Sequence, residues 1–151
     1  MPELRLKRIA TEATFNQYKD DLRKLIEVYI KKAEREDNVE DILEDIEFEL
    51  YNPAYISSII FKNNKAYGFL LARITYGRKN LVCIIEHFFA RSYMEPVYSI
   101  LEDYLRKHYV GEVWFMTYRN EDAFEKLMHK YEIGKGFKKV AILFKKILEG
   151  E

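Results

Sequence analysis

The feature that most constrains the fold is residues 80–107, where a continuous apolar run passes through a short polar corner into an amphipathic helix. The run from Leu81 to Ala90 is mostly β-branched and aromatic, interrupted only by Glu86 and His87. Such a run predicts a central strand buried on both faces. After the corner at residues 91–95, apolar residues recur at helical spacing, at Val97, Ile100, Leu101, Tyr104 and Leu105. Strand, corner and helix therefore form a half-unit whose helix start is a place where α/β proteins often hold phosphate.

The composition limits the class of protein. The 151 residues fit one domain, and 48% hydrophobic with 15% aromatic residues exclude a disordered chain. Twenty-five basic and twenty-five acidic residues leave no net charge, so we expect no nucleic-acid partner. One cysteine, Cys83, fits a reducing compartment. With no leader-like start and no apolar run of membrane-spanning length, we expect a cytoplasmic protein with no membrane partner.

The remaining patterns predict a β-α-α-β-β-β-α-β-α-β order. We expect a strand at residues 4–9, a helix from Thr14 capped by Thr11 or Thr14, a helix at 39–50, a hairpin of strands 55–61 and 66–76, a helix at 96–107, a parallel strand at 112–117, a helix from Asn120 and a strand at 140–147. Asn63 and Asn64 form the hairpin turn. Gly68, inside a strand, indicates a bulge or a close backbone approach.

The strongest charge asymmetry lies between residues 34 and 49, where nine acidic side chains stand against Arg35 alone. One interpretation is a solvated helix face, which is the usual role of a charge run. The other is an acidic wall that attracts a cationic substrate. The sequence leaves both open.

The element order and two local matches resemble the GCN5-related N-acetyltransferase (GNAT) family. The segment RNEDAFEKLMHKYEIGKGFKKV is similar to the family's second motif, in which Asn120 and Ala123 start a helix that ends just before Gly136-Phe137. The strand IIEHFFA, entering a helix with Ile100-Leu101, is similar to the first half of the cofactor motif. The resemblance covers nearly the whole chain. It implies a single α/β (α+β) GNAT-like domain, residues 1–151, whose mixed sheet has splayed fourth and fifth strands.

The resemblance also implies acetyl-CoA as the cofactor, with its arm paired to the backbone of the fourth strand and its pyrophosphate in a glycine-containing loop. The implied cofactor-binding residues are Phe88, Phe89, Ala90, Arg91, Ser92, Tyr93, Met94 and Asn120. This chain, however, has ARSYMEPVYS at the loop, which is a few residues shorter than the family form and contains no glycine. Glycines serve there because only a backbone without Cβ approaches the phosphate closely.

Two capping arrangements fit this corner. Either Ser92 and Glu95 form a capping box, or Pro96 is the first helical residue and Glu95 is the cap. In both, a carboxylate stands where a diphosphate would bind, at a cost on the order of 1 to 4 kcal/mol. We therefore expect weak acetyl-CoA binding unless Arg91 or a nearby lysine offsets Glu95.

For catalysis, Glu86 matches the family position of a carboxylate base. Burial disfavours a charged carboxylate, which suits a group that must take up a proton. The alternative is a structural acid paired with a lysine or a tyrosine. We expect His87 on the opposite face of the sheet unless a bulge intervenes. The family's acid, a tyrosine, falls near Leu127 here, so Tyr131, one turn later, is the substitute. Three scattered histidines and one cysteine give no metal-ligand spacing.

These residues favour an N-acyltransferase that moves an acetyl group to a primary amine of a small molecule or a protein, with a cationic acceptor as one reading of the acidic helix. The alternative is a catalytically inactive GNAT-fold binding or interaction module, favoured by the glycine-free corner and the missing tyrosine. A homodimer scaffold that uses residues 113–116 is a third reading.

Overall fold

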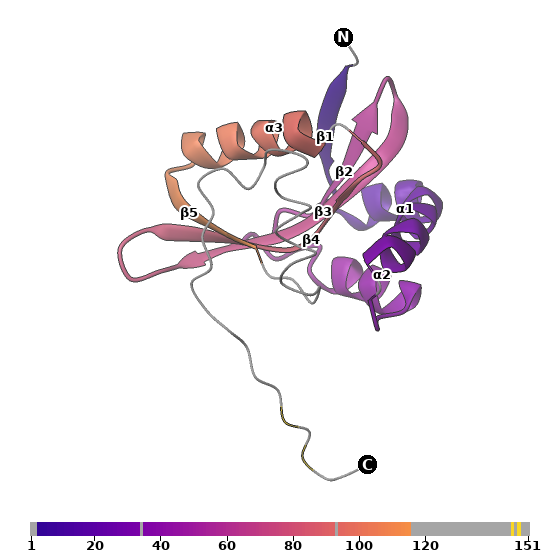
Figure 1. The fold of residues 1–151 in the computed structure, drawn as a ribbon, viewed down its shortest axis with the longest axis horizontal. Helices are drawn as coiled ribbons and strands as arrows, with labels where there is room; N and C mark the ends of the chain where they lie inside the picture. Colours follow the sequence, from indigo (N-terminus) through magenta and orange to yellow (C-terminus); the bar gives the residue numbers. More distant parts are fainter. Residues whose placement is uncertain (1–2, 34, 93, 116–145, 147, 149–151) are drawn as a thin grey trace.

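The computed structural model describes residues 3–33, 35–92, 94–115, 146 and 148. Within this part, one mixed sheet has the strand order β1-β2-β3-β4-β5 (Figure 1). The first four strands are antiparallel neighbours and β5 runs parallel to β4. The strands are β1 (Leu4–Arg8), β2 (Ser58–Lys62), β3 (Lys65–Tyr76), β4 (Leu81–Ala90) and β5 (Val110–Phe115). A hairpin feeding a central strand and a helical crossover after it are therefore confirmed.

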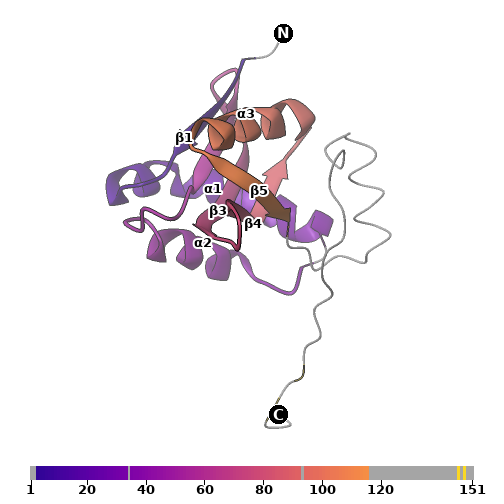
Figure 2. The ribbon, with the colours of Figure 1, turned by 90° about the vertical axis from the view of Figure 1, so that its left-hand side faces the viewer.

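Helices cover both faces of this sheet. Helices α1 (Glu12–Ala33) and α2 (Val39–Phe48) lie on one face, and α3 (Met94–Lys107) lies on the other. Figure 2 views the sheet from the β5 edge, with α3 on one side and α1 and α2 on the other. The result is a three-layer α/β domain with β4 between the two helical layers.

Each face of β4 has its own apolar core. On one face, Phe89 of β4 and Phe69 of β3 pack with Leu22 and Ile26 of α1. Ile85 and Phe88 pack against the α3 layer, which contributes Val97, Tyr98, Leu101 and Leu105. Burying each large apolar side chain contributes about 1.5–3 kcal/mol. This double burial explains why the apolar run forms the strand, which has the predicted bounds.

Several element ends differ from the predictions. Helix α1 begins at Glu12, and Thr11 is its cap, because the Thr14 amide donates to Thr11 Oγ1 at 3.2 Å. Strand β2 begins at Ser58, since Tyr55 forms only an isolated bridge with Arg73. The other differences are β1 ending at Arg8, α2 ending at Phe48, β2 ending at Lys62, β3 beginning at Lys65, α3 beginning at Met94 and β5 beginning at Val110. The predicted helix from Asn120 and the strand at 140–147 lie outside the described residues.

Both predictions for the hairpin, its Asn63-Asn64 turn and its close approach at Gly68, are confirmed. Asn63 and Asn64 take positive φ values of 50° and 66°, as a tight hairpin turn requires. Gly68 pairs with Ala90, and a Cβ on Gly68 would lie 2.1 Å from the carbonyl oxygen of Phe89. The β2–β3 register also shifts beside Gly68. Glycine at this position lets β3 approach the last residues of β4.

The described part of β5 pairs with only the first half of β4. The register runs from Leu81 opposite Val110 to Ile85 opposite Phe115, where the described part of β5 ends. From Glu86 to Ala90, no described strand lies along the β5 side of β4. The predicted splay belongs to the region beyond Phe115, so it stays a prediction.

Candidate active site

A β-bulge places Glu86 and His87 on the same side of the sheet. In the β3–β4 register, Leu71 is opposite His87 and Ala72 is opposite Ile85, which leaves Glu86 as the extra residue. Glu86 contacts Arg73 and Tyr55, whereas His87 contacts Tyr29 of α1. Strict alternation would have put them on opposite faces. The exception allowed for a bulge applies, and both groups lie on the α1/α2 face.

Glu86 is held by two partners. Arg73 Nε donates to Glu86 Oε1 at 2.9 Å, and the Tyr55 hydroxyl donates to the same oxygen at 3.3 Å. The Glu86 side chain is 29% exposed, so the expected burial among apolar groups is wrong. Burial, with the neighbouring Glu86 charge as the next cause, raises the pKa of Tyr55 to about 12, so Tyr55 remains a donor at neutral pH.

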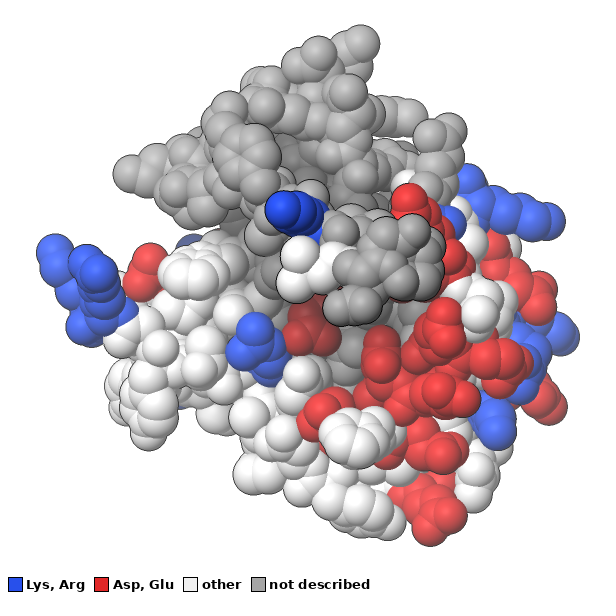
Figure 3. All heavy atoms as spheres, turned by 90° about the horizontal axis from the view of Figure 1, so that it is seen from below, with Lys and Arg blue, Asp and Glu red and all other residues white. Residues whose placement is uncertain are grey.

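The acidic residues of α2 gather on the same face of the molecule as Glu86. Figure 3 shows a dense group of acidic side chains there, and the exposed members on α2 are Glu40, Asp41, Glu44, Asp45 and Glu47. Partial burial, followed by the charge of Glu86, raises the pKa of Asp45. An electrostatic effect of Glu86 on Asp45 indicates that the candidate base and the acidic helix share one field. This field favours a cation near Glu86.

A capping box and one ion pair arrange the acids of α2, and a second ion pair lies just before the helix. Asn38 caps the helix, its side chain accepting from the Asp41 amide at 2.9 Å while Asp41 reaches back to the Asn38 amide. Arg23 of α1 pairs with Glu40, and Arg35 pairs with Asp37 at 2.6 Å. Acidic side chains in the first turn of a helix also interact favourably with the helix dipole. Local helix stability therefore accounts for part of the charge run.

His87 is a buried neutral histidine. Its side chain is 7% exposed, and its Nδ1 lies 3.0 Å from the Tyr29 hydroxyl. Burial lowers the pKa of His87 to about 4, with the charge of Arg35 acting in the same direction and that of Asp37 against it. At neutral pH the imidazole therefore carries no charge, and its contact ties β4 to α1.

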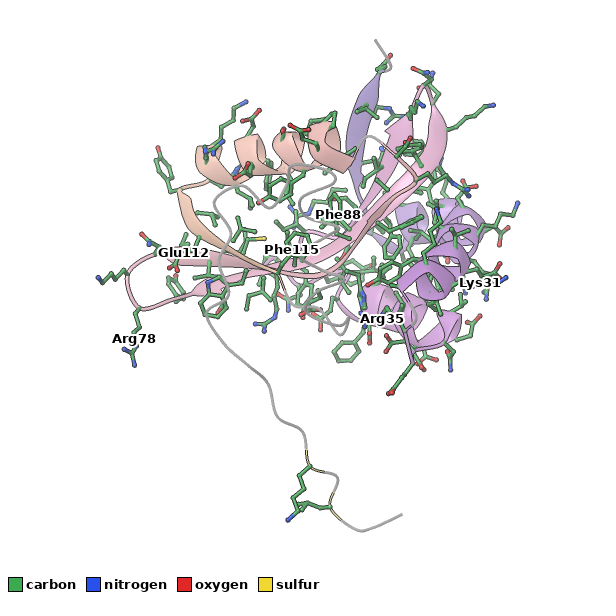
Figure 4. The ribbon with its side chains drawn as sticks, viewed as in Figure 1. Lys31, Arg35, Arg78, Phe88, Glu112 and Phe115 are labelled. Atoms are coloured by element: carbon green, nitrogen blue, oxygen red, sulfur yellow. The ribbon has the colours of Figure 1, made fainter. Side chains whose placement is uncertain are left out.

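The side chains at the end of β4 pack into the two apolar cores. Phe88, Phe89 and Ala90 have buried side chains. Phe88 lies between the sheet and α3 beside Phe115, with ring centroids 6.2 Å apart (Figure 4). Phe89 packs on the other face with Tyr29. Because both faces are filled, these three residues can contact a ligand in the sheet plane only through main-chain groups.

The corner after β4 differs from both predicted capping arrangements. Helix α3 is described from Met94, two residues before the start that the Pro96 arrangement requires, and Ser92 Oγ is hydrogen bonded to the Tyr67 hydroxyl instead of to the Glu95 amide. The Arg91 amide donates to the Tyr67 carbonyl at 3.2 Å. Glu95 is exposed in the first helical turn, so a carboxylate does stand at the helix start as expected. Tyr67 thus contacts the corner twice, through its carbonyl at Arg91 and through its hydroxyl at Ser92.

The remaining predicted site residues are not placed. Asn120, Tyr131 and Tyr93 lie outside the described residues, as does the side chain of Met94. Sequence reasoning missed Arg73, Tyr55 and Tyr29, which hold Glu86 and His87. Arg73 had a signal, because a basic residue inside a largely apolar strand calls for an acidic partner on the neighbouring strand.

Comparisons with known proteins show which solved structures have a similar fold. The sequence matches no protein-family model and no curated protein. Solved structures do match over nearly the whole length. The aminoglycoside acetyltransferase AAC(6')-Iy with a CoA-containing bisubstrate analogue has 16% identity and a TM-score of 0.66, covering 96% of this chain and 99% of that one. A soil-metagenome aminoglycoside acetyltransferase with sisomicin has 12% identity and a TM-score of 0.64, covering 95% and 96%.

A predicted acetyltransferase from Clostridium acetobutylicum, solved with acetyl-CoA, has 10% identity and a TM-score of 0.66, covering 98% of this chain and 97% of that one. The chain has the GNAT fold. In the GNAT fold, β4 is the fourth strand that the sequence resemblance assigned to the cofactor arm. Glu86 therefore lies at the bulge of that strand.

Two further findings concern the described part of the GNAT fold only. No helix there is long and apolar enough to cross a lipid bilayer. No three histidine, cysteine, aspartate or glutamate side chains there are grouped so that they could hold a metal ion.

Proposed function

We propose that this chain transfers an acetyl group from acetyl-CoA to a primary amine of a small cationic molecule. The observation that carries the proposal is the position of Glu86. It is a part-exposed carboxylate at the bulge of β4, held by Arg73 and Tyr55. The match in fold to acetyltransferases solved with CoA or acetyl-CoA supports it.

The proposed chemistry needs two proton movements. Glu86 takes one proton from the substrate ammonium, directly or through a water, which leaves a neutral amine able to attack a carbonyl carbon. Acetyl-CoA supplies an activated acyl carbon and a thiolate leaving group. The nitrogen–carbon bond forms, the carbon–sulfur bond breaks, and the second amine proton passes to the sulfur through an acid, for which Tyr131 remains the proposed residue. Arg73 and Tyr55 orient Glu86 for the first step.

The fit to acetyl-CoA differs between its two ends. Main-chain groups of residues 86–90 suit an amide-containing arm that adds to a strand edge. The first turn of α3 suits a diphosphate poorly, because Glu95 is there and the Tyr67–Ser92 contact fixes the corner. We therefore propose that acetyl-CoA binds, with an affinity lowered by Glu95.

The acceptor is proposed from the charge of the α2 face. Exposed acids on α2 lie in the same field as Glu86, which favours an acceptor with several positive charges. The structures solved with sisomicin and with an acetylneamine-derived bisubstrate analogue are of proteins named for aminoglycoside acetylation, in keeping with a polyamine acceptor. A basic protein segment is the alternative acceptor.

A second candidate function is a GNAT-fold binding module without catalysis. Glu86 has an ion pair and a tyrosine partner, which is what a structural acid requires, and the corner lacks the glycines of a pyrophosphate loop.

A homodimer that associates through β5 also stays a proposal. Its residue Trp114 is 45% exposed, and Met116 lies outside the described residues.

Calorimetry with acetyl-CoA and desulfo-CoA separates the two candidate functions. The transferase predicts saturable binding of both ligands at micromolar concentration, and turnover of acetyl-CoA with a linear polyamine such as spermidine. A neutral amide in place of the amine is the control acceptor. Absence of binding at millimolar ligand would favour the binding module. Binding without turnover of any polyamine or basic peptide would remove the catalytic proposal alone.

A further inference from the structure

A second site, separate from Glu86, lies between α1 and the β2–β3 hairpin. It is a pocket of about 480 Å³ on the α1 face, at the end of the sheet where β4 enters the corner. Four basic side chains line it, and each comes from a different segment: Arg5 of β1, Lys24 of α1, Lys65 of β3 and Arg91 after β4. Asp21 is the one acid in its lining. The pocket is therefore strongly positive in a chain whose net charge is zero.

The basic groups of this pocket are available to a ligand. All four are exposed, and none forms an ion pair among the described residues. The Arg5 guanidinium lies over the Phe61 ring, 4.5 Å from its centroid. Tyr18 meets the same ring edge to face at 5.3 Å. These contacts hold Arg5 in place, so less side-chain freedom is lost when an anion binds.

Four like charges that converge on one concave surface focus the field and attract an anion. Arginine and lysine together are the usual phosphate-binding side chains, and the pocket volume lies in the range of small-molecule sites. We propose that this pocket binds the phosphate groups of a nucleotide-sized ligand. The proposal rests on the pocket and does not require that the chain transfer acetyl groups.

Arg91 connects the pocket to the corner. It is the first residue after β4, and Glu95 follows four residues later in the first turn of α3. A phosphate near this corner is therefore repelled on the α3 side and attracted on the α1 side. The phosphates have two candidate sources, which are the nucleotide end of CoA and a separate phosphorylated small molecule.

The test measures binding of pyrophosphate and of adenosine 3′,5′-diphosphate to the full chain by calorimetry. The variant Lys24→Gln with Arg91→Gln removes two charges from the pocket. The matched control, Lys79→Gln with Arg78→Gln, removes the same two charge types from the turn after β3, and Arg78 lies far from α1 (Figure 4). We expect the pocket variant to bind at least tenfold more weakly and the control to change by less than twofold. Both should unfold at the wild-type temperature, and added salt should weaken wild-type binding.

Three outcomes overturn the pocket. The first is no binding of either probe at millimolar concentration. The second is an equal loss of probe affinity in the pocket and control variants. The third is a loss of probe affinity in Arg91→Gln alone with none in Lys24→Gln alone, which would put the phosphate at the corner.

Two outcomes support the pocket and identify the source of the phosphate. If the pocket variant weakens CoA binding while acetyl-pantetheine binding is unchanged, the source is the nucleotide end of CoA. If CoA binding is unchanged while the probes bind more weakly, the ligand is a separate phosphorylated molecule. Either result is independent of turnover.

Discussion

The two faces of β4 are built from the same short run of residues, yet they do different work. On the α3 face, Cys83, Ile85, Phe88 and Ala90 lie in a largely apolar layer whose buried polar groups include the Tyr98 hydroxyl. On the α1/α2 face, Glu86 and His87 meet Arg73, Tyr55 and Tyr29. Every ionisable side chain of β4 except the Cys83 thiol is therefore on one face.

The bulge at Glu86 produces this difference. Without the extra residue, strict alternation would direct either Glu86 or His87 toward the α3 layer, where no described charged group contacts β4. A charged or polar side chain without a partner in that layer would cost about 2 kcal/mol or more. The bulge keeps the α3 face apolar and puts both polar groups where partners exist. The comparison teaches that one irregular residue separates the packing function of the strand from its chemistry.

The largest expected effect concerns Glu86. If the α1/α2 face carries the chemistry, Glu86→Gln should lower kcat for acetyl transfer about 1,000-fold, or about 4 kcal/mol, because the amide cannot take the proton. The KM for acetyl-CoA should change by less than threefold. Steady-state kinetics with acetyl-CoA and a polyamine would measure both values.

Glu112→Gln is the matched control, since Glu112 lies on β5 away from α1 and α2 (Figure 4). It should leave kcat within twofold of wild type. A parallel loss of kcat and acetyl-CoA affinity in Glu86→Gln would show that Glu86 only maintains the site. The comparison of faces would then concern stability alone.

The apolar pattern was enough to predict β4, because a strand buried on both faces consists of an almost uninterrupted run of apolar residues. The bounds Leu81 and Ala90 are the first and last residues of that apolar run. Gly68 was also readable, because only glycine tolerates a carbonyl oxygen at 2.1 Å from the place of its missing Cβ. These features depend on one residue or on one run.

The site depends on features that residue types do not record. The bulge is a property of backbone pairing, and nothing in the letters IIEHFF shows that Glu86 is unpaired. The Tyr67–Ser92 contact joins residues that are 25 positions apart and replaces the predicted capping box. The basic pocket joins Arg5, Lys24, Lys65 and Arg91, each of which alone looks like a solvated charge.

The second prediction concerns the buried histidine on the α1/α2 face. The pKa of His87 is lowered from 6.5 to about 4 because burial disfavours the cation. Above about pH 6.5 neither state binds this proton. As the pH falls from about 6.5 to about 4, the unfolded chain takes up the proton and the folded chain does not, so the free energy of unfolding falls by about 3 kcal/mol.

Chemical denaturation at several pH values would measure this effect. His87→Gln keeps a hydrogen-bonding side chain beside Tyr29 but cannot titrate, so its unfolding free energy should depend less on pH across that window. His108→Gln changes an exposed histidine and is the control. If wild type and His87→Gln lose stability in parallel between pH 6.5 and 4, the imidazole is not held neutral, and the polar face is less isolated from solvent than its burial indicates.

The smallest effect tests the α3 face. Cys83 is fully buried there, and burial raises the pKa of its thiol to about 12. Cys83→Ser introduces a hydroxyl into a largely apolar layer and should cost about 2 kcal/mol of unfolding free energy, while Cys83→Ala, which adds no polar group, should cost about 1 kcal/mol. Denaturant unfolding of both variants would measure the difference, and kcat should change in neither.

A thiol reagent checks the same point without a substitution. In the folded chain the protonated, buried Cys83 thiol should react only as fast as the protein opens, whereas in denaturant it should react at once. If Cys83→Ser instead matched Cys83→Ala in stability, the hydroxyl would have found a partner or water within the α3 layer. The α3 layer would then be able to accommodate polar side chains. In that case the bulge would not be needed to keep Glu86 and His87 on the α1/α2 face.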